Sequence, residues 1–426
     1  MSDRIVVPLG RRGLPVFSRL GQEELFLFRR TADREHAILG VGSLRSFRAE
    51  GPAGAFDRWS EAFRERDDVS MGHLGYELRL DSEPRSGAPP VARTSWPALF
   101  WFVPRIIVEW ERGEAFLKVL REDEQAGMEL AERLFGPWDP GRMRAFPELR
   151  LLVDEQRYLE RAERALSAIQ RGDVYELNYC IERQAACLSI QAPHWADRCL
   201  RLSDAPFAGV YKLGDQMAVC LSPERFLEFT QDGVLAEPMK GTRPRSEDPG
   251  TDQDMIDELR KDPKERAENI MATDVMRNDL SRFARAGTVE VRSLCEVRSM
   301  SSVHQMVSVV HARIGDTDRT QVVRACFPMA SMTGAPKVRA MQLIDELEGG
   351  LRGLFSGSLG YLMPDGSGDL NVVIRTLLFD GTKDLVSLMT GSALTALCDP
   401  VQEWEECDLK ARSVIDLLRD EPATEA

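Results

Sequence analysis

Lys240 stands in the run Glu237-Pro238-Met239-Lys240-Gly241-Thr242, between an apolar residue and a glycine that favours a turn. An amine in such a place can lose part of its hydration, which lowers the pKa of the ammonium and makes the nitrogen a nucleophile. Lys240 is therefore a candidate for covalent catalysis. Lysine is also a residue type that usually stays in solvent, so a hydrated turn residue is the alternative interpretation of the same run.

Two segments open with an aspartate followed by a proline, which is typical of a helix start. Asp262-Pro263 precedes one predicted helix and Asp399-Pro400 precedes the last one. Each helix carries two acids three positions apart on one face: Glu265 and Glu268 on the first, and Glu403 and Glu406, followed by Lys410, on the last. Such carboxylates suit Mg²⁺. The helix dipole also favours acids there, and spacing alone does not bring the helices together.

The composition is that of a globular chain with room for a sizeable core, at 426 residues and 43% hydrophobic content. Lys and Arg number 55 against 69 Asp and Glu, a net charge of −14, which argues against nucleic acid or an anionic membrane as a partner. The N-terminus does not resemble a signal peptide, and the eight cysteines form no Cys-x-x-Cys pair. We therefore expect reduced thiols and a cytoplasmic protein.

Strand-like runs follow one another with helices inserted between them, which favours an α+β fold with large antiparallel sheets. Residues 1–150, where such runs alternate with breaks rich in Gly and Pro, are expected to form an N-terminal subdomain. A helical pattern from Asp154 to Gly172 opens a second subdomain, predicted for residues 151–416. Residues 417–426 are expected to be a tail.

Several motifs together resemble the chorismate-utilising enzymes, which include anthranilate synthase component I, isochorismate and salicylate synthases, and aminodeoxychorismate synthase component I. The motifs occur in the family's order across residues 154 to 415, whereas the N-terminal part resembles the family only weakly. They are SPERFLEF (222–229), EPMKGTRPR (237–245), KERAENIMATDVMRNDLSR (264–282), SSVHQMVS (301–308), SMTGAPKVRAMQLIDELE (331–348), GSLGYL (357–362), NVVIRT (371–376) and EWEECDLKA (403–411).

This resemblance implies two large antiparallel sheets packed as a sandwich with helices outside, an anthranilate synthase component I-like fold, and a magnesium-dependent site between the sheets. The acids of the two helices would meet around Mg²⁺, with Glu268 and Glu406 as direct ligands and Glu265 and Glu403 as further ligands or water holders. The metal would hold the ring carboxylate of chorismate.

The lysine of the Pro-x-Lys-Gly-Thr motif resembles the family's aminodeoxychorismate synthases, because the other branches usually have alanine there. The isochorismate and salicylate branches also activate water with a lysine where this chain has Glu176, so water is not the expected nucleophile. The resemblance implies that Lys240 attacks C2 of chorismate while Glu224, with a pKa raised by burial or by other carboxylates, protonates the departing C4 hydroxyl. Ammonia would then replace the lysine and give 4-amino-4-deoxychorismate, a precursor of 4-aminobenzoate and folate.

The family pattern also implies residues that hold the substrate. Arg375 carries a guanidinium fork that suits the enolpyruvyl carboxylate. Further contacts are implied for Tyr361, Lys410, Gly391, Thr242 and His304, each of which could instead be an ordinary paired or packed residue. The run Gly391-Ser392-Ala393-Leu394 departs from the family's Gly-Gly-Gly-Ile, so Cβ atoms would crowd a close approach there.

The sequence lacks the Gly-x-Cys-x-Gly nucleophile turn of a glutaminase. Ammonia is therefore expected from a separate glutamine amidotransferase subunit. Two other functions stay open at this point. One is anthranilate synthase component I, and the other is a non-catalytic subunit that binds chorismate or the amidotransferase.

Overall fold

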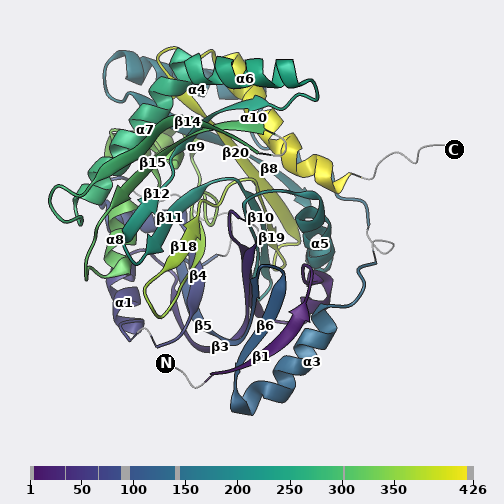
Figure 1. Cartoon of the computed structure of the whole chain (residues 1–426). Helices are drawn as coiled ribbons and strands as arrows, with labels where there is room; N and C mark the ends of the chain where they lie inside the picture. Colours follow the sequence, from purple (N-terminus) through teal and green to yellow (C-terminus); the bar gives the residue numbers. More distant parts are fainter. Residues whose placement is uncertain are drawn as a thin grey trace.

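The computed structural model describes residues 4–33, 35–65, 67–87, 96–139, 144–300 and 303–419. Throughout these residues the strands pair antiparallel and form one hydrogen-bonded network. The network divides into two runs of strands that share β5 (Leu99–Glu111). Helices cover its outer faces. At the top of the view in Figure 1 lie α4 (Glu155–Gln170), α6 (Pro249–Lys261), α7 (Pro263–Ser281) and α10 (Pro400–Ile415).

The first run proceeds through β1, β6, β5, β3, β2, β9, β10, β19, β20 and β8, with β7 and β16 also paired to β8. Its strands are β1 (Arg4–Arg11), β2 (Leu25–Arg30), β3 (His36–Ala49), β6 (Glu114–Leu120), β7 (Arg150–Leu151), β8 (Glu176–Ala186), β9 (Phe207–Leu213), β10 (Gln216–Ser222), β16 (Gly334–Ala335), β19 (Thr376–Asp380) and β20 (Leu385–Thr395).

The second run leaves β5 through β4 and continues through β17, β18, β11, β12 and β15, and β15 also pairs with β13 and β14. Its strands are β4 (Ser70–Leu74), β11 (Arg225–Thr230), β12 (Gly233–Ala236), β13 (Met239–Pro244), β14 (Glu290–Ser299), β15 (Val303–Ala312), β17 (Ser358–Leu362) and β18 (Gly368–Asn371).

Strand β5 connects the two runs because it changes partner along its length. Its first half, Leu99–Phe102, pairs with β4, and its second half, Ile106–Glu111, pairs with β6. The change falls at Pro104, which lacks a backbone N–H and lies opposite an irregularity in β3 between Ser43 and Arg45. A core of buried side chains, including Trp59, Trp101 and Phe226, draws on both runs. The predicted α+β fold with large antiparallel sheets is confirmed, and β5 joins the two sheets.

The helices pack in groups on this network. Helices α4, α9 and α10 lie on β8 and β20, α6 and α7 lie on β13, β14 and β15, and α3 and α5 lie on the first run. The bounds are α1 (Ala55–Ala62), α2 (Arg79–Ser82), α3 (Glu124–Leu134), α4 (Glu155–Gln170), α5 (Ala192–Leu202), α6 (Pro249–Lys261), α7 (Pro263–Ser281), α8 (Arg319–Cys326), α9 (Lys337–Glu348) and α10 (Pro400–Ile415).

Both predicted Asp-Pro helix starts are confirmed. The Asp262 carboxylate accepts hydrogen bonds from the backbone N–H groups of Lys264 at 2.9 Å and Glu265 at 3.1 Å. Asp399 accepts one from Val401 N at 2.9 Å. Since these caps satisfy backbone donors that a helix leaves open, they fix where α7 and α10 begin and so where their first acidic residues lie.

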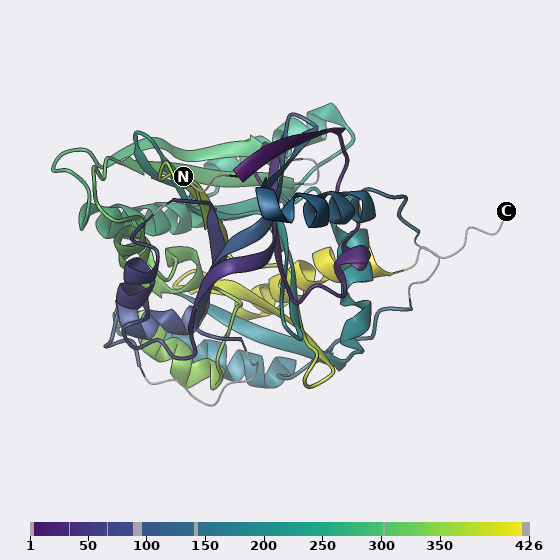
Figure 2. The same ribbon diagram turned by 90° about the horizontal axis from the view of Figure 1, so that it is seen from below.

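The two predicted subdomains are connected by strand pairing. From the first 150 residues, β2 pairs with β9 and β4 pairs with β17. Figure 2 accordingly shows purple and blue strands of the N-terminal part beside teal strands that follow residue 150. Of the predicted tail, residues 420–426 lie outside the described residues. Within the described chain, no helix is long and apolar enough to cross a membrane.

Candidate functional site

The Lys240 side chain contacts a carboxylate from the other run of strands. Lys240 lies on β13, and its Nζ donates to Oε1 of Glu176, the first residue of β8, at 2.7 Å. Both side chains are buried, with 11% of Lys240 and 5% of Glu176 exposed. The pair therefore joins two distant strands within a site largely shielded from water.

A bulge in β13 shapes the backbone around Lys240. The pairing of β13 with β15 shifts between Met239 and Thr242, and Gly241 within this shift has a φ of +88°. A Cβ on Gly241 would lie 3.0 Å from Oε2 of Glu265, so a larger residue would be both strained and crowded. Bulges re-aim side chains, and this one lets Gly241 pack on α7 while its neighbour reaches β8.

The predicted lowering of the Lys240 pKa is wrong for this arrangement. Burial by itself lowers the pKa of the ammonium, but the negative charges of Glu176 and Glu268 outweigh it, so the pKa is raised. Lys240 is thus a buried ammonium held by carboxylates. Before the nitrogen can act as a nucleophile it must give up a proton.

The two acidic helix starts meet in the structure, which spacing alone could not show. Lys264 of α7 donates through Nζ to Oε1 of Glu403 on α10 at 2.7 Å, and the same Nζ lies 3.9 Å from Oε1 of Glu268. Glu265 also interacts electrostatically with Glu406 of α10. All the predicted metal-binding acids therefore lie around one junction between the helices.

The acids at this junction suit a divalent cation in type and in charge. Oε1 of Glu268 is buried and accepts no hydrogen bond, and burial raises the pKa of this carboxyl to about 7. A buried carboxylate oxygen that accepts no hydrogen bond would be stabilised by a cation. In the part of the chain that is described, no group of three or more His, Cys, Asp or Glu side chains converges closely enough to hold a metal. Here Lys264 and Lys410 hold Glu403 and Glu406 instead.

Glu224 lies between β10 and β11, close to the cations of the site. Burial raises its pKa to about 7, although the positive charges of Lys240, Lys410 and Arg375 act in the opposite direction. The upward shift expected of a general acid is therefore present. Because all three charges act on Glu224, the side chains of Lys240, Lys410 and Arg375 lie around its carboxyl group.

Arg375 is a partly buried guanidinium at a special backbone position, with a φ of +49°. Burial lowers its pKa, and the nearby charges of Asp204 and Glu224 do not restore it. Among the described residues Arg375 makes no side-chain ion pair. A guanidinium that has lost hydration without gaining a partner favours an anionic ligand.

Lys410 and Gly391 contact one another. Nζ of Lys410 donates to the backbone oxygen of Gly391 at 2.9 Å and lies 2.6 Å from Oε1 of Glu406. A Cβ on Gly391 would lie 2.4 Å from Sγ of Cys180 on the paired strand, so glycine is required there by packing. The next residue, Ser392, is buried and its hydroxyl lies 3.1 Å from that of Tyr158. Its side chain therefore packs towards α4.

His304, Thr242 and Tyr361 are placed differently from the residues above. His304 is fully buried, and its ring nitrogens hydrogen-bond Ser299 Oγ and Asp252 Oδ1, both at 2.9 Å. These contacts fix it against α6, so the predicted position beside a substrate ring gains no support. Thr242 is exposed. For Tyr361, burial raises the pKa, and the charged groups that act on it are Asp369, Arg29, Glu228 and Arg225.

Sequence reasoning missed the direct partners of the predicted residues. From the sequence, Glu176 is only a departure from a water-activating lysine, and Lys264 has no predicted role. Gln305, one residue beyond His304, donates through Nε2 to the backbone oxygen of Gly241 at 3.1 Å. The i, i+4 spacing of Lys264 and Glu268 was the one local signal for any of these contacts.

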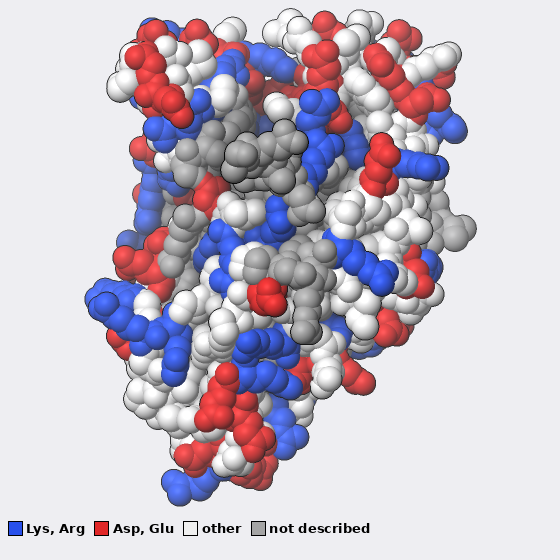
Figure 3. Space-filling model, turned by 90° about the vertical axis from the view of Figure 1, so that its right-hand side faces the viewer, with Lys and Arg blue, Asp and Glu red and all other residues white. Residues whose placement is uncertain are grey.

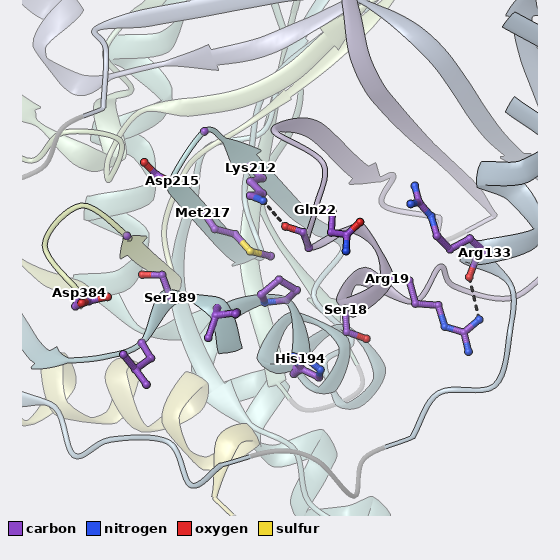
Figure 4. A pocket seen from close by; sticks show the side chains of 16 residues that line it. Ser18, Arg19, Gln22, Arg133, Ser189, His194, Lys212, Asp215, Met217 and Asp384 are labelled. Carbon is purple, nitrogen blue, oxygen red and sulfur yellow. Dashed lines mark hydrogen bonds between the residues drawn. The ribbon is translucent and has the colours of Figure 1, made fainter. Parts of the chain in front are cut away.

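A cavity of about 860 Å³ lies elsewhere in the molecule (Figure 4), lined among others by Lys212, His194, Met217 and Asp384. The cavity lies at the start of β20, because Asp384 directly precedes this strand. Glu176 pairs with Thr395, which is the last residue of β20. A strand of this length separates the two ends by roughly 30 Å. The cavity is therefore not part of the Lys240 site.

One face of the molecule, which lies on the right in Figure 1, carries charges of both signs on its surface. Figure 3 shows Lys and Arg side chains interspersed with Asp and Glu over the face that lies on the right in Figure 1. The net charge of −14 is thus not gathered into one acidic field on this face. The charges that set the pKa of Lys240 come from nearby residues, above all from its ion pair with Glu176.

A family model described as chorismate binding enzyme matches residues 23–416. The chain belongs to this family. The match includes nearly all of both predicted subdomains, so the relationship extends well into the N-terminal part that resembled the family only weakly by its motifs. Lys240, Glu224 and the acids of α7 and α10 all lie inside the matched range.

The relatives of this chain are named for two different enzymes, aminodeoxychorismate synthase and anthranilate synthase component 1. Aminodeoxychorismate synthase of Streptomyces griseus is 41% identical over 369 residues, which cover 82% of this chain and 50% of the relative. This chain thus spans about half the length of that relative. Anthranilate synthase component 1 of Thermus thermophilus is 31% identical over 414 residues, covering 89% of this chain and 88% of the relative.

The fold recurs in solved structures of the family. Anthranilate synthase component I from Streptococcus pneumoniae aligns with a TM-score of 0.80 at 21% identity, covering 89% of this chain and 92% of that one. At this identity the likeness concerns the fold alone. It confirms the predicted anthranilate synthase component I-like fold.

Replacement of Glu224 by glutamine should change how stability depends on pH. The pKa of about 7 in the folded protein exceeds the ordinary 4.5, so the unfolded chain loses this proton first and stability falls as pH rises from about 4.5 to 7. The cost at pH 8 is about 3 kcal/mol, at 1.4 kcal/mol for each pKa unit. We expect Glu224→Gln to melt at a higher temperature than the wild type at pH 8 and at the same temperature near pH 4.5.

Melting curves followed by circular dichroism across this pH range measure the effect. Glu182→Gln is the matched control, because Glu182 is also a buried glutamate but lies on β8 and is bonded to Gln184 Nε2 at 2.7 Å. A difference between wild type and Glu224→Gln that stays constant with pH would contradict the expected titration of Glu224.

Proposed function

We propose that this chain is the chorismate-aminating subunit of an aminodeoxychorismate synthase. It would replace the C4 hydroxyl of chorismate with an amino group and give 4-amino-4-deoxychorismate, which leads to 4-aminobenzoate and folate. The observation that carries the proposal is the buried amine of Lys240, 2.7 Å from Glu176 and beside the carboxyl of Glu224. The name of the Streptomyces griseus relative supports the same reaction.

In the proposed first step, Nζ of Lys240 forms a bond to C2 of chorismate. The two ring double bonds each shift by one position, and the bond between C4 and its hydroxyl oxygen breaks. Glu224 gives its proton to that oxygen, so water leaves. A carboxyl with a pKa of about 7 still holds this proton near neutral pH.

In the second step ammonia attacks C4 and the double bonds return to their first positions. The bond between C2 and Lys240 breaks, which frees the amine, and the enolpyruvyl group stays on the ring throughout. The attacking nitrogen gives up one proton, which returns to the carboxylate of Glu224. Chorismate and ammonia are thus converted to 4-amino-4-deoxychorismate and water. Neither step oxidises or reduces the ring.

The positively charged side chains around Glu224 are proposed to bind the substrate. The guanidinium of Arg375, which has no ion-pair partner among the described residues, would hold the enolpyruvyl carboxylate. Lys410, bonded to the backbone of Gly391 at 2.9 Å, would provide a second positive charge. Tyr361 and Thr242 are proposed as weaker hydroxyl contacts.

The acids at the junction of α7 and α10 would hold Mg²⁺. Glu268 and Glu406 are proposed as direct ligands, with Glu265 and Glu403 holding further positions or waters. The ion would neutralise the ring carboxylate of chorismate and orient it. Support comes from the buried Oε1 of Glu268, which accepts no hydrogen bond.

A glutamine amidotransferase subunit is proposed as the source of ammonia. The sequence contains no glutaminase nucleophile turn, and the Thermus thermophilus relative is named as component 1 of its enzyme. That relative also favours a second candidate, anthranilate synthase component I. It would release pyruvate and form an aromatic ring, and a lysine nucleophile has no part in that outcome.

The product of the reaction distinguishes the candidates. We expect incubation of the protein with chorismate, Mg²⁺ and ammonium to give a compound whose mass retains the enolpyruvyl group, as measured by mass spectrometry. Lys240→Ala should abolish it because the nucleophile is lost. Lys261→Ala, at an exposed position of α6, should leave it unchanged.

Anthranilate and pyruvate from the wild type would contradict the proposed reaction. Chorismate that binds without turnover by the wild type would instead support a subunit that serves only for binding.

Metal binding can be tested separately from turnover. Loss of a direct ligand should weaken Mg²⁺ binding by at least the roughly 10-fold that loss of an outer partner commonly costs. We therefore expect Glu268→Gln to bind Mg²⁺ at least that much more weakly in calorimetric titrations made with chorismate present. Glu405→Gln, an exposed acid on α10, serves as control. Equal affinities for wild type and Glu268→Gln would exclude Glu268 as a ligand.

A further inference from the structure

Lys240 enters the proposed reaction with a proton that it must lose. The surrounding acids favour the ammonium form, and an ammonium nitrogen has no lone pair with which to attack carbon. Glu224 cannot take this proton, because its role is to give one to the departing hydroxyl. A second acid–base residue is therefore required, within hydrogen-bond reach of Nζ.

The structure offers one carboxylate in that position among the described residues. Oε1 of Glu176 lies 2.7 Å from Nζ of Lys240, whereas Glu268 and Glu406 act on Lys240 only through their charges. Lys264 and Lys410 contact Glu403 and Glu406.

The position of Glu176 is firmly fixed. It is the first residue of β8, where it pairs with Thr395 of β20 on one side and with Ala335 of β16 on the other. Only 5% of its side chain is exposed, so little water reaches its carboxylate. A base held on two paired strands keeps a constant distance to its partner.

We propose that Glu176 is the general base that removes a proton from Nζ of Lys240 before the amine attacks C2. The proton moves to Oε1 of Glu176 as the N–H bond breaks, and the electron pair stays on nitrogen. When ammonia later frees the lysine from C2, Glu176 returns the proton. This inference rests on the proposed function and adds to it a base that acts opposite the acid Glu224.

The groups that face Lys240 come from several elements. Glu176 lies on β8, Glu268 on α7, Glu406 on α10 and Glu224 in the connection between β10 and β11. Because Glu268 and Glu406 remain in place when Glu176 is changed, they form a constant background for a pH experiment.

The test is Glu176→Gln, which preserves the shape and an oxygen for the hydrogen bond but cannot take up the proton. General-base catalysis typically contributes on the order of 10²- to 10⁴-fold, so we expect kcat for 4-amino-4-deoxychorismate at pH 7 to fall by such a factor. The KM for chorismate should stay nearly unchanged. The loss should shrink as pH rises, because hydroxide in solution can then replace the missing base.

Two further variants make the result specific. Glu176→Asp retains a carboxylate and should recover part of the activity, with the pH dependence of the wild type. Glu182→Gln, at a buried position six residues along β8, should behave like the wild type. A kcat for Glu176→Gln within a few-fold of the wild type, or an equal loss at every pH, would overturn the proposal.

A labelling experiment separates this inference from the proposed reaction. Acetic anhydride acetylates neutral amines, so Lys240 in the wild type should react slowly at pH 8 and more rapidly in Glu176→Gln, where the charge of Glu176 is gone. Peptide mass spectrometry measures both rates. Failure of the wild type to make 4-amino-4-deoxychorismate would refute the proposed function. Equal labelling rates in the two proteins would refute control of Lys240 by Glu176, whatever the product.

Discussion

The contact between the Lys240 ammonium and the Glu176 carboxylate is the interaction on which the site depends. A charge buried alone is costly, and one that is paired and hydrogen-bonded can be retained away from water. Lys264 between Glu403 and Glu268 solves the same problem at the junction of the helices. The site therefore holds acids and amines together in a protein interior, where each group sets the protonation of its neighbours.

The scaffold brings these groups together from distant parts of the chain. Strand β8 supplies Glu176, the bulged strand β13 supplies Lys240, and the capped first turns of α7 and α10 supply the acids. Because each of these is anchored by strand pairing or by a helix cap, the cluster keeps a defined geometry before a substrate arrives. The N-terminal strands contribute indirectly, since β2 and β4 complete the sheets.

Local patterns predicted the helix starts, but they did not predict contacts between residues far apart in the sequence. The Asp-Pro pairs fixed the starts of α7 and α10, and the acid role of Glu224 implied the raised pKa that burial produces. The pKa of Lys240 was predicted in the wrong direction because its partner lies 64 residues away, beyond any local signal. The contact of His304 with Asp252 of α6 was also beyond local patterns, because the two residues are 52 positions apart.

The central claim is that the buried amine of Lys240 becomes covalently attached to the substrate ring. Intact-protein mass spectrometry after rapid acid quenching tests this directly, with chorismate and Mg²⁺ supplied and ammonia withheld. The account predicts a protein heavier by chorismate less one water, with the added mass on the peptide that contains Lys240. Unmodified protein that still makes 4-amino-4-deoxychorismate when ammonia is added, or an adduct at another residue, would contradict it.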